Sequence, residues 1–157
     1  MSCGVIFYKL DKNNKLQILL VTRNSILEDI GGICDNIDIQ ELLLNKTNFK
    51  IDLTELEYNY EIINNKYNHK ILLIKASPDI ATLTCSDFSN YEISGINTLI
   101  KRSIDWISID KFKLYLNTNL ISPRIKLYNL LSKFSIIESE LQTEQVMKQI
   151  KNCVFYR

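Results

Sequence analysis

Two apolar segments separated by a short polar one open the chain. Residues 3–10 (CGVIFYKL) alternate in the period-two manner of a β-strand. Residues 16–23 (LQILLVTR) predict a second strand, and the unbroken apolar run at 18–21 indicates burial on both faces, which is typical of a central strand in a sheet. The polar turn DKNN at 11–14 lets these two strands pair as a hairpin.

The apolar pattern breaks after the second strand. Residues 24–37 predict a loop that holds a Gly-Gly pair at 31–32, half of the protein's four glycines. A helix is predicted over 39–47, because Asp38 can cap its first turn and Glu41, three positions further on, completes a capping box.

The middle of the chain predicts three more strands. Residues 56–63 and 69–76 are expected to be two strands joined by an Asn-rich turn. Residues 77–99 are expected to be a long irregular excursion, and 103–107 a short strand. His69, at the start of its strand, is expected to be exposed and structural.

Three helices are predicted in the last third of the chain. They cover residues 110–116, 123–134 and 138–151. Asp110, Ser122 and Ser135 are the expected N-caps, and Glu138 completes a capping box with Ser135. This order of strands and helices predicts an α+β fold, with a mixed sheet and helices on both of its faces.

Composition narrows the functional classes. The 157 residues, 46% of them hydrophobic, fit one domain without a membrane span or a signal peptide, and the net charge of +1 excludes a strongly basic nucleic-acid module. Four cysteines without metal-ligand spacing and a single histidine indicate free thiols in a reducing compartment, hence an intracellular, cytoplasmic protein. Abundant Ile, Asn and Lys with only two Ala indicate an AT-rich genome. Clusters of lysine are therefore weak evidence for a functional basic patch.

Several short motifs in order resemble a Nudix domain. These motifs are S-x-G-V-I-x-Y at 2–8, L-L-V-x-R at 19–23, D-I-G-G at 29–32, W-I-S-I-D-K-F at 106–112 and S-P-R at 122–124. The resemblance covers about residues 2–134. It implies a Nudix-like α/β/α sandwich with a mixed sheet over residues 1–134, followed by a C-terminal helical extension over 135–157.

The Nudix signature G-x5-E-x7-R-E-U-x-E-E-x-G-U, with U an aliphatic residue, implies a helix whose glutamates hold Mg²⁺ or Mn²⁺ against a diphosphate. Gly32 matches its first glycine, and Asp38 falls where its first glutamate belongs. Aligned without a gap, the E-E pair falls on Lys50-Ile51.

A five-residue deletion gives a second register, in which Asn45-Lys46 occupies the E-E pair and Glu41-Leu42 the R-E pair. Neither register keeps the acidic pair. Each puts a lysine in or beside the place of the metal-binding carboxylates, where we expect it to repel Mg²⁺ and serve as an internal counter-ion.

The candidates for substrate binding are two arginines and two glycines. Arg23 ends a predicted central strand, where the resemblance implies a phosphate contact, and Gly31 and Gly32 lie in the glycine turn. Arg124 follows the Ser-Pro helix start, where backbone donors and a guanidinium can hold an anion.

The candidates for catalysis are Asp38 and Glu41, which together with Asp29 are also the candidates for a displaced metal site. Helix capping explains Asp38 and Glu41 fully and is the preferred interpretation, with Asp29 a solvated loop acid.

Three functional hypotheses remain. The first is a Nudix-fold protein with a degenerate catalytic motif, a pseudoenzyme that binds a nucleotide, an RNA end or a protein without standard hydrolysis. The second is an active Nudix-type pyrophosphohydrolase, dependent on Mg²⁺ or Mn²⁺ and acting on a nucleoside diphosphate derivative or capped RNA through displaced acids. The third is a structural subunit that docks on a second copy or another protein through residues 135–151.

Overall fold

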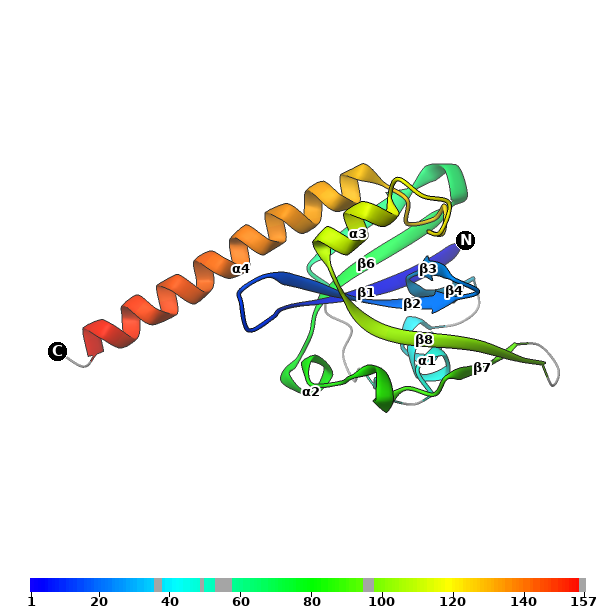
Figure 1. The fold of residues 1–157 in the computed structure, drawn as a ribbon, viewed down its shortest axis with the longest axis horizontal. Coiled ribbons are helices and arrows are strands. Elements are labelled where there is room, and N and C mark those ends of the chain that lie inside the picture. Colours follow the sequence, from blue (N-terminus) through cyan, green and yellow to red (C-terminus); the bar gives the residue numbers. More distant parts are fainter. Residues whose placement is uncertain (36–37, 49, 53–57, 95–97, 156–157) are drawn as a thin grey trace.

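A mixed β-sheet forms the centre of the structure, a computed structural model that describes residues 1–35, 38–48, 50–52, 58–94 and 98–155 (Figure 1). Its strands are β1 (Ser2–Leu10), β2 (Leu16–Arg23), β3 (Ile26–Glu28), β4 (Ile30–Ile33), β5 (Tyr60–Asn64), β6 (His69–Lys75), β7 (Tyr91–Ser94) and β8 (Thr98–Ser108). The strand order is β5-β6-β1-β2-β8-β7, with β3 paired to β2 and β4 paired to β1. The β1–β6 pair is parallel, and the other pairs are antiparallel.

The predicted hairpin of β1 and β2 is confirmed. Tyr8 lies opposite Ile18 and Leu10 opposite Leu16. The turn between the strands is held by the Asp11 carboxylate, which accepts from the backbone N–H of Lys15 at 3.0 Å. Local polar chemistry therefore closes this hairpin where the DKNN pattern predicted it.

The expected central position of β2 is also confirmed, because its successive side chains enter two different cores. Ile18 and Leu20 lie in the core on one face of the sheet, and Leu19 and Val21 lie in the core on the other. The strand is flanked by β1 and β8, so both its edges are also paired.

Helices cover both faces of the sheet, as the order of elements predicted. The helices are α1 (Ile39–Lys46), α2 (Pro78–Ala81), α3 (Ile109–Tyr115) and α4 (Tyr128–Phe155), with short 3-10 turns at Asn65–Tyr67 and Cys85–Asp87. Leu43 of α1 and Ile80 of α2 belong to the core with Val21. Phe112 of α3 and Phe134 of α4 pack edge to face at 5.5 Å in the opposite core.

The predicted loop at residues 24–37 is wrong, because it contains β3 and β4. A tight turn at Asn24 and Ser25, both with positive φ, returns the chain onto β2. β4 then pairs with β1, and a Cβ on Gly31 would lie only 2.3 Å from the Cys3 carbonyl oxygen. The glycine here therefore permits close backbone approach within a sheet.

The predicted irregular excursion at 77–99 is partly wrong, since it holds α2, β7 and the start of β8. β8 is also longer than the predicted strand at 103–107 and has eleven residues. Its buried residues Arg102 and Ile104 alternate with exposed ones up to Asp105, after which Ile107 is buried and Ser108 is exposed. That serine caps α3 by accepting from the Lys111 N–H at 3.2 Å, so Asp110 is not the cap.

Two predicted strands flank the Asn-rich turn, and both exist with shifted limits. The strand expected at 69–76 is confirmed as β6. The strand expected at 56–63 is observed from Tyr60 to Asn64, and residues 56–57 of that prediction lie outside the described residues.

The C-terminal third contains one long helix, so the prediction of two helices there is wrong. Pro123 lies in a turn, and α4 begins at Tyr128 and continues for 28 residues. Ser135 is inside this helix and donates to the Leu131 carbonyl at 3.2 Å, which leaves it no role as a cap. None of the described helices, α4 included, combines the length and the apolar character that crossing a bilayer requires.

The two halves of α4 are joined by a continuous buried stripe. Leu130, Phe134, Ile137 and Leu141 all enter the same core as β1 and β2. The predicted capping box at Ser135 does not form. Burial of this apolar stripe in the core favours a helix that continues through Ser135.

Ile137→Ala tests the contribution of this stripe. We expect it to lower the free energy of unfolding by about 2–5 kcal/mol, since Ile137 is fully buried in the core. Ile136→Ala is the matched control, because Ile136 is its neighbour and is half exposed; its effect should stay within about 0.5 kcal/mol. Equal losses in urea unfolding would contradict the packing of α4.

Candidate functional site

The glycine pair on β4 brings helix α1 close to the sheet. Gly31 and Gly32 lie opposite Gly4 and Cys3 of β1. A Cβ on Gly32 would come within 3.2 Å of Leu42 Cδ1. The bare backbone of β4 therefore forms the surface against which α1 packs.

Helix α1 begins and ends on polar contacts. Asp38 is its N-cap, as predicted, and accepts from the Gln40 N–H at 3.4 Å. At the other end, the buried Thr47 hydroxyl donates to the Leu43 carbonyl at 2.6 Å and accepts from the Ile51 N–H. Lys46 lies in the last turn, where the helix dipole favours a cation.

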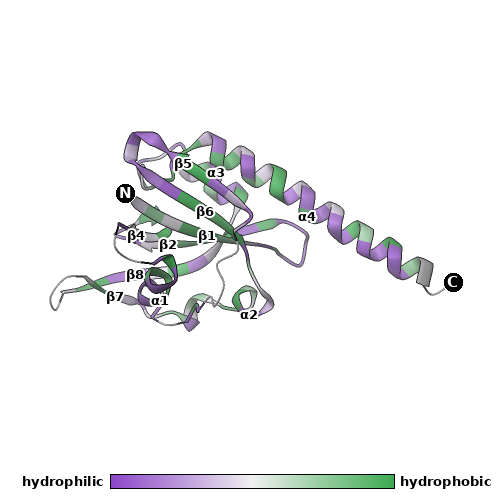
Figure 2. Cartoon of the chain, turned by 180° about the vertical axis from the view of Figure 1, so that it is seen from behind, coloured by the Kyte–Doolittle hydropathy of each residue, from purple (hydrophilic) through white to green (hydrophobic). Residues whose placement is uncertain are grey.

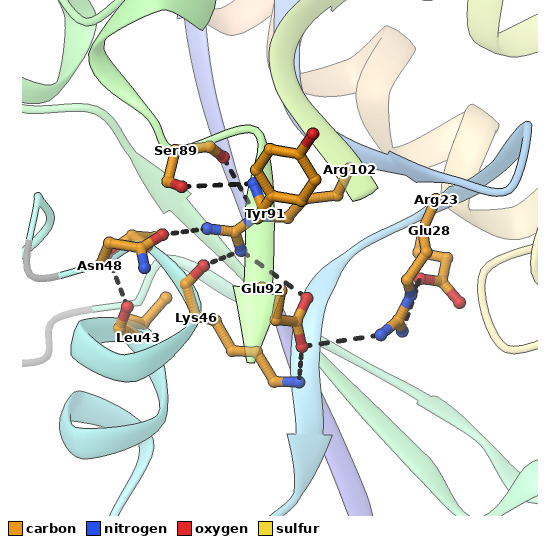
Figure 3. A network of polar contacts seen from close by, with 10 residues as sticks. Arg23, Glu28, Leu43, Lys46, Asn48, Ser89, Tyr91, Glu92 and Arg102 are labelled. Carbon is orange, nitrogen blue, oxygen red and sulfur yellow. Dashed lines mark hydrogen bonds and ion pairs between the residues drawn. The ribbon is translucent and has the colours of Figure 1, made fainter. Parts of the chain in front are cut away.

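The Lys46 side chain reaches a buried carboxylate, that of Glu92 on β7 (Figure 3). The Glu92 side chain is only 8% exposed, and two arginines also approach it. Arg23 Nη1 of β2 lies 3.6 Å from Glu92 Oε1, and Arg102 Nη1 of β8 lies 3.7 Å from Glu92 Oε2. We call these four residues the Glu92 cluster. In it a lysine of α1 serves as an internal counter-ion, as expected from the sequence.

The Arg102 guanidinium is the most buried charge of the cluster, with a side chain 1% exposed. It donates to the backbone carbonyls of Lys46 and Ser89 and to the Asn48 side chain. Burial lowers the pKa of Arg102, and the negative charge of Glu92 opposes that shift. These donor bonds make Arg102 a structural clamp between β8 and the end of α1.

Arg23 contacts a second acid as well. Its Nε and Nη2 donate to Glu28 Oε2 of β3 at 3.1 and 2.9 Å. Arg23 thus bridges Glu28 and Glu92, and its charge is already engaged on both sides.

A separate buried chain of polar groups runs behind the cluster. His69 Nε2 lies 2.6 Å from Asp29 Oδ2, and His69 Nδ1 lies 2.7 Å from Ser2 Oγ. The expectations of an exposed His69 and a solvated Asp29 are both wrong, since both side chains are buried. Gly4 makes room for the pair, because a Cβ there would lie 1.8 Å from the Asp29 carboxylate.

A small cavity lies between the Glu92 cluster and β4. It is lined by Val21, Arg23, Glu28, Asp29, Ile30, Gly31, Lys46, Glu92 and Arg102, and its volume is about 10 Å³. A cavity needs roughly 10–15 Å³ to hold one water molecule. The space between these charges is therefore too small for a diphosphate.

Each carboxylate that lines this cavity already has a partner. Glu28 pairs with Arg23, Asp29 with His69, and Glu92 with Lys46. Within the described part of the chain, no group of three or more His, Cys, Asp or Glu residues is arranged to hold a metal ion. These acids are therefore already paired with side chains of the same chain.

The candidate residues from the sequence divide into two groups. Arg23, Asp29 and Gly31 line the cavity, and Gly32 lies beside it against α1. The other three lie elsewhere: Asp38 caps α1, Glu41 is exposed in its first turn, and Arg124 is exposed in the segment before α4.

Sequence reasoning missed Glu92 and Arg102, which are central to the cluster. Glu92 lies in the segment that was expected to be irregular, so its strand was not predicted. Arg102 is in register with Ile104 in the alternation of buried and exposed residues along β8, and it is one of only four arginines in the chain. These two signals together indicate that its charge faces the protein interior.

An open polar cleft lies next to the cluster, across β2 and β8. It is lined by Thr22, Asn24, Ser25, Asn90, Lys101, Arg102 and Ser103, and its volume is about 430 Å³. We call it the β2–β8 cleft. Among the described residues that line it, none is acidic, and Lys101 is an exposed cation.

Glu92→Gln tests the cluster. We expect a loss of about 3 kcal/mol in the free energy of unfolding, because Arg102 would keep a buried charge without its acid. Glu61→Gln is the control, since the Glu61–Lys70 pair on β5 and β6 is partly exposed and should contribute less than about 1 kcal/mol. Losses of equal size in urea unfolding would show that the Glu92 cluster is not a buried ionic unit.

No protein-family model matches the chain, and no curated protein matches it.

Proposed function

We propose that this chain is a Nudix-like domain that has lost standard metal-dependent hydrolysis and acts by binding a nucleotide, free or at an RNA end. The observation that carries the proposal is the pairing of Glu28, Asp29 and Glu92 with cations or imidazole of the same chain. A hydrolase of this class needs carboxylates that are open to divalent cations.

The limits of α1 favour the shortened register of the Nudix signature. The helix ends at Lys46, so the ungapped register would place the E-E pair beyond the helix, on Lys50-Ile51. The shortened register places that pair on Asn45-Lys46, within the last turn. Lys46 then occupies a metal-ligand position and contacts a carboxylate instead of a metal.

The charge of Lys46 makes this exchange chemically consistent. An ammonium group beside Glu92 neutralises the carboxylate without any bound ion. The same ammonium would repel Mg²⁺ or Mn²⁺ from the small cavity. The arrangement thus replaces a divalent cation with a fixed charge of the chain.

The β2–β8 cleft is the surface that we propose for the ligand. Its volume lies within the range of about 300–1,000 Å³ that small-molecule sites occupy. The hydroxyls of Thr22, Ser25 and Ser103, with the Lys101 ammonium, match the phosphate and ribose oxygens of a nucleotide. This chemistry favours a nucleotide over an apolar ligand.

Hydrolysis assays test the loss of catalysis. We expect no release of phosphate or mononucleotide from nucleoside diphosphate derivatives or capped RNA in Mg²⁺ or Mn²⁺, because the carboxylates are paired within the chain. A known Nudix hydrolase serves as the positive control. Steady turnover that disappears with Asp38→Ala or Glu41→Ala would overturn the proposal in favour of displaced acidic ligands.

The double change Asn45→Glu with Lys46→Glu is the converse experiment. We expect it to create Mn²⁺ binding, visible as a rise in Tm on adding the metal, because it replaces the Lys46 ammonium with a carboxylate beside Glu92 and adds a second carboxylate at the neighbouring position. The matched control is Asn45→Gln with Lys46→Gln, which removes the ammonium without adding acids. Equal responses to metal in both variants would contradict the shortened register.

Calorimetric titration with ADP tests binding in the cleft. We expect Lys101→Ala to weaken the affinity by about three- to tenfold, since it removes one charge-assisted contact to phosphate. Lys113→Ala removes an exposed lysine of α3 that does not line the cleft and should leave the affinity unchanged. Absence of ADP binding by the unmodified protein would refute a nucleotide site there.

A further inference from the structure

Two of the four cysteines are neighbours across the paired strands β1 and β4, which lie side by side next to the N-terminus (Figure 2). Cys3 lies opposite Gly32 in this antiparallel pair. The pairing continues one residue past the end of β4, because the Cys34 N–H donates to the Met1 carbonyl at 3.2 Å. Cys34 is therefore the diagonal neighbour of Cys3, two positions beyond the residue opposite it.

Both cysteine side chains belong to the same face of the sheet. Residues directly opposite in an antiparallel pair share a face, and so do residues two apart along one chain. Gly32 therefore fixes the face of both cysteines, and a Cβ on Gly32 would contact Leu42 of α1. The two thiols thus lie on the face that α1 covers, and Gly32 has no side chain to separate them.

The two thiols differ in exposure. Cys3 is 1% exposed, whereas Cys34 is partly exposed. Burial, together with the adjacent Cys34 thiol, raises the pKa of the Cys3 thiol to about 12. That influence of Cys34 requires the two sulfur atoms to be close in space. Because a thiol attacks as its thiolate, Cys34 is the accessible member of the pair and Cys3 the protected one.

We propose that Cys3 and Cys34 are a redox-active dithiol, which a disulfide oxidant such as oxidised glutathione converts reversibly into a disulfide within the chain. The other two cysteines are placed elsewhere. Cys85 begins a 3-10 turn and Cys153 lies near the end of α4, so neither belongs to the β1–β4 pair. The dithiol does not line the β2–β8 cleft, and its chemistry is independent of nucleotide binding.

The reaction consists of two thiol–disulfide exchanges. The Cys34 thiolate first attacks one sulfur of oxidised glutathione, so that a Cys34–glutathione bond forms, the glutathione S–S bond breaks and one glutathione leaves. Cys3 then loses its proton to solvent, and its thiolate attacks the Cys34 sulfur and releases the second glutathione. The chain loses two electrons and two protons, and one glutathione disulfide becomes two thiols. Excess reduced glutathione reverses both steps.

The backbone can reach the spacing that this bond requires. Cysteine Cα atoms in a disulfide usually lie about 4.4–6.8 Å apart, and diagonal neighbours in an antiparallel pair lie about 7–8 Å apart. Cys34 lies one residue beyond Ile33, the last residue of β4. The remaining approach of about 1 Å therefore moves a segment outside the strand.

The position of the bond gives it a structural consequence. Helix α1 packs on the glycine backbone of β4 and presents Lys46 to Glu92. A disulfide from Cys34 to β1 joins the two strands covalently at the edge of that surface. Oxidation would thus fix the chain just before it enters α1.

Peptide mapping by mass spectrometry tests the pair, on the full chain carrying Cys85→Ser and Cys153→Ser so that the exposed thiols are absent. After incubation with excess oxidised glutathione, we expect a Cys3–Cys34 disulfide within one chain, release of two glutathione molecules per chain, and recovery of both thiols with dithiothreitol. A stable glutathione adduct on Cys34 with Cys3 still reduced, a disulfide between two chains, or no reaction would overturn the proposal.

Two matched variants of that same chain test the order of the steps. Cys3→Ala should stop after the first exchange, with one glutathione released and a stable mixed disulfide on Cys34. Cys34→Ala should react at least about tenfold more slowly, because its remaining thiol is buried and has a raised pKa. Equal rates in the two variants would contradict the role of Cys34 as the attacking thiol.

Discussion

The buried carboxylate of Glu92 connects four parts of the fold. It lies on β7, and its cationic neighbours come from α1, β2 and β8. Of the three cations, Arg102 depends most on this acid, because its side chain is 1% exposed and its charge has been taken from water. The edge of the sheet, its central strand and the covering helix are thus held in register by one negative charge.

This arrangement decides what chemistry the α1 face can perform. A site that activates water through divalent cations keeps its carboxylates open to the ions. Here the carboxylates of Glu28, Asp29 and Glu92 are paired with Arg23, His69 and Lys46 of the same chain. Under the proposed loss of hydrolysis, these carboxylates contribute to holding β3, β4 and α1 against the sheet. Hydrolysis and this form of stabilisation compete for the same groups.

Local patterns predicted the elements whose signals lie within a few residues. The alternation in β1, the apolar run in β2 and the Asp38 cap of α1 are such signals. The strands β3 and β4 were not predicted, because their three and four residues are too few to show a periodic pattern of hydrophobic positions.

The site itself was hidden by separation along the chain. The pair of Lys46 and Glu92 spans 46 residues, and that of His69 and Asp29 spans 40, so no local window contains either. At Ser135 the prediction failed for the opposite reason. The local sequence matches a helix cap, but the buried apolar stripe from Leu130 to Leu141 keeps the helix continuous. Tertiary packing outweighed a local preference worth about 1 kcal/mol.

The length of α4 explains why its last turns extend beyond the sheet. Its 28 residues span about 42 Å, whereas β1, with nine residues, spans about 30 Å. The sheet face cannot cover such a helix, and any crossing angle between them leaves more of it bare. On the bare part, Lys148 and Lys151 are suited to water, but Val146 and Ile150 are not.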